Sequence, residues 1–167
     1  SVTNGVSFVA NPGKGLSWFR DTGYAQLIEE IDKTEGSKPI AVIFNLGVND
    51  LGNAGNYVSY MTSIASTLKS KNCKLFYMSV NPINRLMLSN TGRADRSEAK
   101  IRSFNTYMQK NLPSSYTYID MYSYLKATGY SFASDKYGAG NIDDGLHYTA
   151  RTYKRIFTQC LRSLKNS

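Results

Sequence analysis

Short, nearly continuous apolar runs in this chain alternate with longer stretches in which apolar residues recur at helical spacing. The runs Pro39 to Leu46 and Lys74 to Val80 are almost wholly apolar, which is typical of strands covered by helices on both faces. A shorter strand is predicted at Tyr116 to Ile119. Val6 to Ala10 ends at Asn11-Pro12-Gly13 and is predicted to be a strand followed by a turn.

Between the strands, polar and charged residues separate apolar ones at intervals of three and four, as on one face of a helix. This pattern predicts helices around residues 24–31, 57–68, 101–108, 121–127 and 153–164. Ser97 and Thr149 are suited to cap the helices that they precede. Residues 83–96 show no periodicity, and residues 129–143, rich in Gly, Ser, Asp and Asn, are predicted to form a long surface loop.

Strands that alternate with helices indicate an α/β domain with a largely parallel sheet and right-handed crossovers. At 167 residues with 41% hydrophobic content, the chain can bury one sizeable core, and we expect residues 1–167 to form a single domain. Functional side chains in such sheets gather at the carboxyl ends of the strands. The segments that follow the predicted strands are therefore the candidates for chemistry.

The net charge of +8 and the isoelectric point of about 9.5 come from thinly spread Lys and Arg, with mild concentrations at residues 85–102 and 151–165. We expect no nucleic-acid site, because no motif of that kind accompanies the charge. No apolar stretch approaches the roughly 18 residues of a membrane span, and no signal region opens the chain. The sequence leaves open the oligomeric state and the compartment, including a secreted or cell-surface location with a signal that has been removed.

The two cysteines, Cys73 and Cys160, lie far apart and match no metal or redox spacing. We expect both to be buried apolar residues. A disulfide would require that the strand near Cys73 meet the helix that carries Cys160. One histidine with nearby carboxylates is too small a ligand set for a catalytic metal, so neither a metal nor another cofactor is expected.

The strongest chemical signal is the segment Asp144-Gly145-Leu146-His147, which holds the only histidine and lies just before the last predicted helix. A histidine becomes a general base when a carboxylate holds its other ring nitrogen and stabilises the imidazolium. Asp144 is near enough to do so if the segment forms a tight turn, and Asp143 competes for that role. The alternative is a purely structural histidine.

A second signal, Gly47-Val48-Asn49-Asp50, follows a predicted strand and places a side-chain amide where the strand opens into a loop. An amide at that position can donate a hydrogen bond to a developing oxyanion. The alternative is that Asn49 and Asp50 serve only as turn residues.

These two motifs, in this order, resemble the SGNH/GDSL hydrolases, a family of serine esterases and acylhydrolases with a three-layer α/β/α, flavodoxin-like fold. The resemblance implies that His147 and Asp144 are catalytic and that Asn49 is an oxyanion donor, with Gly47 and Asp50 as structural support. It also implies a backbone N–H donor after the second strand, for which we choose Gly15 over Gly13. Trp18 is a candidate substrate contact, because it lies close to this glycine turn, and its alternative is core packing.

The family's nucleophile motif, Gly-Asp-Ser, is absent from the 167 residues. Ser1 lies too close to the Val6 strand to leave room for the intervening helix. The sequences around Ser7, Ser17 and Ser79 do not match the family's motif either, and Ser79 is the least unsuitable of them. We expect the native protein to extend upstream by roughly 25 to 40 residues that carry a central strand and a helix. Without that strand, apolar surface and backbone groups would be exposed.

We therefore expect a serine esterase or acylhydrolase that cleaves carboxylic esters with a Ser-His-Asp triad whose serine lies upstream. O-acetyl groups on carbohydrate are the preferred substrate, because aromatic and polar loops dominate and no long apolar lid is visible. The alternative is a degenerate relative that binds carbohydrate or a cell-surface polymer without hydrolysing it.

Overall fold

The computed structural model describes residues 5–34, 36, 38–90, 96–134 and 143–165. In chain order its elements are α1 (Leu16–Trp18), η1 (Phe19–Gly23), α2 (Tyr24–Asp32), β1 (Ile40–Phe44), α3 (Ala54–Ser70), β2 (Cys73–Met78), α4 (Arg85–Asn90), α5 (Glu98–Asn111), β3 (Tyr116–Ile119), α6 (Met121–Thr128), β4 (Phe132–Ser134), β5 (Asp143–Tyr148) and α7 (Ala150–Lys165). The predicted strands at 39–46, 74–80 and 116–119 and all the predicted helices are confirmed.

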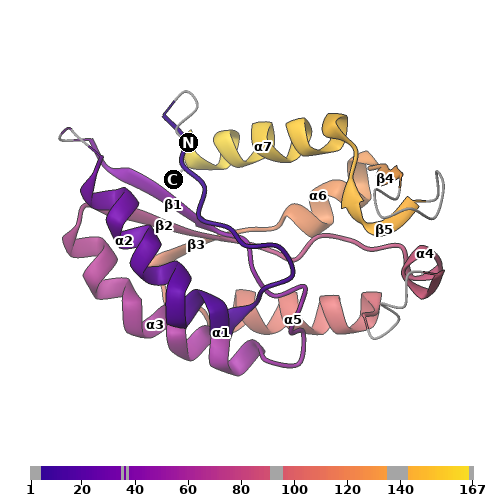
Figure 1. The fold of residues 1–167 in the computed structure, drawn as a ribbon, viewed down its shortest axis with the longest axis horizontal. Coiled ribbons are helices and arrows are strands. Elements are labelled where there is room, and N and C mark those ends of the chain that lie inside the picture. Colours follow the sequence, from indigo (N-terminus) through magenta and orange to yellow (C-terminus); the bar gives the residue numbers. More distant parts are fainter. Residues whose placement is uncertain (1–4, 35, 37, 91–95, 135–142, 166–167) are drawn as a thin grey trace.

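A parallel sheet of order β1-β2-β3 forms the centre, with Ile40 opposite Cys73 and Leu75 opposite Tyr116. Alternate residues of β2 point to opposite faces: Tyr77 packs into the core under α3 and α5, and Phe76 packs into the core under α6 and α7. Figure 1 shows these helices on the two sides of the sheet. The three-layer α/β/α prediction is therefore confirmed.

Among the described residues, β1 is an edge strand that pairs only with β2. The prediction of a strand at Val6 to Ala10 is wrong, because only Val6 forms an isolated bridge. A strand needs a neighbour along its length to satisfy its backbone N–H and C=O groups, and among the described residues no strand pairing continues from Val6 through residues 7–10. Ile43, on the β1 face that α3 does not cover, is 36% exposed, and Phe157 of α7 is 43% exposed.

A small antiparallel pair, β4-β5, lies at the carboxyl end of the main sheet (Figure 1). The predicted loop at 129–143 is thus partly wrong, and its residues 135–142 lie outside the described part. The motif with His147 lies on strand β5, not in a tight turn at the start of the last helix. The unpredicted helix α4 packs against β5, where the Asn84 N–H donates to the Gly145 carbonyl at 2.9 Å.

The helix ends agree with the predicted caps. The Ser97 hydroxyl accepts from the Lys100 N–H at 3.2 Å, and the Thr149 hydroxyl accepts from the Thr152 N–H at 3.4 Å. Cys73 and Cys160 are buried free thiols, as predicted, and they lie in the cores on opposite faces of the sheet. The helices of the described residues are all too short or too polar to cross a membrane.

Candidate active site

A cavity of about 350 Å³, called the main cavity below, lies at the carboxyl ends of β1 and β2. Segments far apart in the sequence line it: the turn at Gly13, Asn49 after β1, Asn81 after β2, Arg96 before α5, and His147 on β5. Topology explains the convergence, because parallel strands deliver the loops that follow them to one edge of the sheet.

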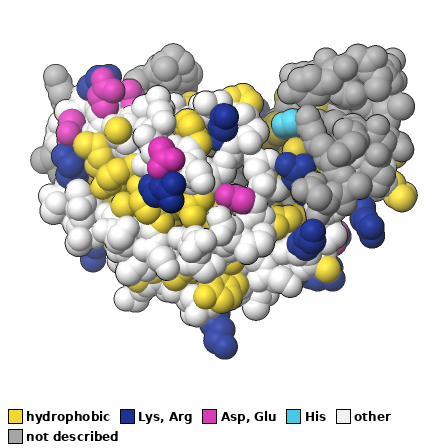
Figure 2. All heavy atoms as spheres, turned by 60° about the horizontal axis from the view of Figure 1, so that its bottom comes forward, with side chains coloured by type: hydrophobic (Ala, Val, Ile, Leu, Met, Phe, Trp, Pro, Cys, Tyr) yellow, Lys and Arg dark blue, Asp and Glu magenta, His cyan; other side chains and the backbone are white. Residues whose placement is uncertain are grey.

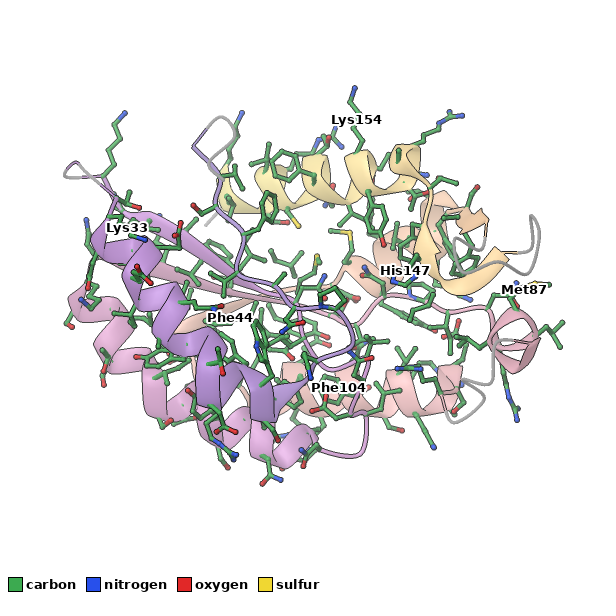
Figure 3. The ribbon with its side chains drawn as sticks, viewed as in Figure 1. Lys33, Phe44, Met87, Phe104, His147 and Lys154 are labelled. Atoms are coloured by element: carbon green, nitrogen blue, oxygen red, sulfur yellow. The ribbon has the colours of Figure 1, made fainter. Side chains whose placement is uncertain are left out.

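His147 lies between β5 and the ends of the central strands (Figure 3), and its side chain is exposed. In the space-filling view of Figure 2, its ring lies on the surface at the edge of a hollow. The side chains of Asp143 and Asp144 lie outside the described residues. The pairing of His147 with Asp144 therefore stays a prediction.

Both ends of the Asn49 amide are hydrogen bonded. Its Nδ2 donates to the Lys14 carbonyl at 2.8 Å, and its Oδ1 accepts from Arg96 Nη2 at 2.7 Å. Arg96 Nε also donates to the Val48 carbonyl at 2.9 Å. The amide of Asn49 thus joins three segments: the turn at residues 11–15, the loop after β1 and the start of α5.

Asp50 points away from the cavity and links the loop after β1 to the start of α1 and to α3. One of its oxygens accepts from the Leu16 N–H at 2.9 Å, and the other accepts from the Tyr57 hydroxyl at 2.6 Å. Burial, and then the hydrogen bond to Asp50, raise the pKa of Tyr57, so this phenol remains a proton donor at neutral pH. A Cβ on Gly15 would lie 2.4 Å from an Asp50 oxygen, which explains why the position suits glycine.

The two glycines that are candidates for the backbone donor differ in their relation to the cavity. Gly13 lines the main cavity together with Asn49 and His147, and Gly15 is not among its lining residues. Trp18 lines a neighbouring cavity of about 200 Å³, between the segment Val9 to Lys14 and the end of β1. The donor role of Gly15 and the substrate contact of Trp18 both stay predictions.

Gly47 allows β1 to turn into the Asn49 loop. Its φ is +120°, a conformation that side chains other than glycine rarely adopt, and an added Cβ would lie 2.5 Å from the ring of Phe104. Phe104 belongs to α5 and lies on the α3 side of the sheet (Figure 3).

No described residue that lines the main cavity is a serine, threonine or cysteine. Ser79, the least unsuitable substitute in the sequence, is fully buried, and its hydroxyl accepts from the Tyr122 N–H at 2.8 Å. Ser7 donates to Glu30 at 2.7 Å. Both hydroxyls thus have structural partners.

Sequence reasoning did not find Arg96, Asn45, Asn81 or Tyr153, which also line the main cavity. Asn45 and Asn81 lie just beyond the carboxyl ends of β1 and β2, and that placement was the signal that could have found them. The Oδ1 of Asn81 is buried and accepts no hydrogen bond within the described part of the chain. Arg96 belongs to the basic stretch 85–102, but composition cannot show which of the basic side chains in that stretch contacts the amide of Asn49.

The sequence model of one family, described as GDSL-like Lipase/Acylhydrolase, matches residues 2–159. No curated protein matches the chain.

Proposed function

The chain belongs to the GDSL-like lipase/acylhydrolase family, whose general activity is ester hydrolysis, and from this premise we propose that it works as a serine esterase. One observation carries the proposal: His147 and Asn49, which lie in distant parts of the sequence, line the same cavity at the carboxyl edge of the sheet. A base and an amide donor facing one space are the two groups that acyl transfer requires beside its nucleophile.

In the proposed mechanism, a serine hydroxyl attacks the ester carbonyl carbon and His147 takes the hydroxyl proton. Asp144 orients His147 and stabilises the imidazolium. The Asn49 amide and a backbone N–H of the turn that holds Gly13 and Gly15 stabilise the oxyanion. His147 then gives its proton to the departing alcohol, and water releases the acid from the acyl-enzyme by the same steps in reverse order.

We place the serine on a further parallel strand that pairs with the open edge of β1. Three observations support this placement: β1 pairs on one side only within the described part of the chain, Ile43 of β1 and Phe157 of α7 are exposed, and the smaller cavity separates the Val9 to Lys14 segment from the end of β1. A strand in this position would end next to Asn49. Intact-mass measurement of the natural protein would exclude such a cis segment if the mass is 18.6 kDa with no companion fragment.

Short acyl esters on a polar alcohol, such as O-acetyl groups on carbohydrate, are the proposed substrates. The asparagines Asn45, Asn49 and Asn81 contribute to the cavity wall, and amides both donate to and accept from hydroxyl groups. Equal activity on long-chain esters would contradict this preference.

The test is hydrolysis of an acetyl ester by the full-length protein, meaning the natural polypeptide with any residues before Ser1. The His147→Ala variant is expected to lose activity by about 100- to 10,000-fold. A fluorophosphonate probe, located by mass spectrometry, would identify the nucleophilic serine. Wild-type activity that persists in His147→Ala would reject the mechanism.

A binding module is the second candidate, favoured because no serine, threonine or cysteine is among the described residues that line the main cavity. It would hold a carbohydrate or a cell-surface polymer without turnover. Calorimetric binding of an acetylated oligosaccharide to a full-length protein that neither hydrolyses the ester nor reacts with the probe would establish it.

A further inference from the structure

Arg96 spans two consecutive acceptors of the loop after β1. Its Nη2 donates to Asn49 Oδ1 at 2.7 Å, and its Nε donates to the Val48 carbonyl at 2.9 Å. A guanidinium is rigid and planar, so two bonds from one group fix both the position and the plane of what it holds.

The contacts with Arg96 and Lys14 favour the same orientation of the Asn49 amide. A side-chain amide can be turned over to exchange its oxygen and nitrogen, but Arg96 carries only donors and therefore selects the orientation with Oδ1 toward it. Nδ2 then faces the Lys14 carbonyl, to which it donates one hydrogen at 2.8 Å. The amide has a second hydrogen, and Asn49 lines the main cavity.

We infer that Arg96 is a positioning residue, which sets the Asn49 amide as an oxyanion donor and increases its donor strength. The increase follows because a cation that donates to the amide oxygen polarises the amide and makes its N–H groups better donors. This inference rests on the proposed ester hydrolysis for its catalytic meaning. The orientation of the amide can be measured independently of activity.

Lysine cannot replace Arg96 in this role. Its ammonium is a point charge on a flexible stem. It has one nitrogen and therefore lacks the two coplanar donors, Nη2 and Nε, with which Arg96 contacts Asn49 and Val48. Arg96→Lys therefore separates charge from geometry, and Arg96→Gln removes both the charge and the fork. Arg162, exposed on α7, offers a matched control in Arg162→Gln.

The experiment measures acetyl-ester kinetics and the side-chain amide signals of Asn49 in ¹⁵N–¹H spectra of the full-length protein, assigned by their loss in Asn49→Ala. In Arg96→Gln and Arg96→Lys we expect kcat to fall about 10- to 100-fold with KM little changed, less than the roughly 100- to 1000-fold loss of the donor itself. The Asn49 signals should shift from their wild-type positions, because the amide oxygen loses its guanidinium donor while Nδ2 keeps the Lys14 carbonyl. Arg162→Gln should leave kcat and these signals unchanged.

Unchanged Asn49 signals in Arg96→Gln, or an unchanged kcat in an active protein, would overturn the inference. If the wild-type protein hydrolyses no ester, the proposed function fails, and the amide signals alone decide whether Arg96 orients Asn49. Thermal melts of each variant identify those that do not fold, and Arg96→Lys, the milder change, then carries the test.

Discussion

At the residue scale, Asp50 and Asn49 are neighbours in sequence with separate tasks. Asp50 turns inward to Leu16 and Tyr57, and Asn49 faces the main cavity, held between Lys14 and Arg96. The pattern of the motif predicted a polar pair at a strand end. Except for Tyr57, which is 7 positions from Asp50, the partners lie more than 30 positions away in the sequence, as the separation of 34 between Leu16 and Asp50 shows.

Gly47→Ala is predicted to lower the free energy of unfolding by about 2 to 4 kcal/mol. The loss has two causes, the positive φ of Gly47 and the 2.5 Å approach of an added Cβ to Phe104. Urea denaturation measures it. Gly52→Ala is the control, because its Cβ meets nothing within 4 Å, and we expect a change within about 0.5 kcal/mol. Equal effects of the two substitutions would contradict this account of Gly47.

Asp144→Asn is predicted to lower kcat by about 100-fold or more, and Asp143→Asn to change it less than about threefold. The difference follows from the Asp-x-x-His spacing, which assigns the orienting carboxylate to Asp144. Both substitutions remove one negative charge from β5, so each controls for the electrostatic effect of the other. The larger loss in Asp143→Asn would transfer the orienting role to that residue.

At the element scale, local patterns predicted most strands and helices but not the pairing of Val6 to Ala10. β3 was predicted with the residues that it has, because a short apolar run between polar segments is a local signal. A strand also needs a neighbour, which no local signal supplies. The same limit applies to α4, whose six residues are too few to show an amphipathic period and whose packing partner β5 lies about 60 residues onward.

The exposed apolar face of α7 leads to a prediction about the open edge. In the full-length protein, Phe157→Asp is expected to lower the free energy of unfolding by at least about 2 kcal/mol, since a covering strand and helix would bury the introduced charge. Leu86→Asp, on α4 and 75% exposed, is the matched control and should cost less than about 0.5 kcal/mol. Urea denaturation compares them, and equally small losses would mean that nothing covers α7.

At the scale of the whole molecule, one sheet joins two cores. Cys73 lies in the core with α3 and α5, and Cys160 lies in the core with α6 and α7, where its sulfur is 3.4 Å from that of Met78. Burial raises the pKa of Cys160 to about 11 and also raises that of Cys73. Each thiol is therefore protonated and unreactive near neutral pH while its side of the sheet is folded.

These thiols test whether the two cores unfold together. Cys73→Ala and Cys160→Ala each keep one cysteine. Pulse labelling of that cysteine with a disulfide reagent at pH 8 measures the urea concentration at which its core unfolds. We expect the two midpoints to agree once each is corrected for the stability of its variant. The reason is that both cores share β2. A midpoint for Cys160 well below that for Cys73 would show that α6 and α7 detach first, and the unfolded chain serves as the control for full labelling.

The sequence by itself determined the α/β class, the order and approximate bounds of the main strands and helices, the family, and the two motifs that contribute residues to the cavity. These properties are local: apolar periodicity, cap residues and short motifs act over a few positions. The tertiary structure alone decided that β1 has an open edge among the described residues, that His147 lies on a strand, that Gly13 instead of Gly15 lines the cavity, and that Arg96 holds Asn49. Each of these depends on hydrogen bonds or packing between distant segments, and only the folded chain brings such segments together.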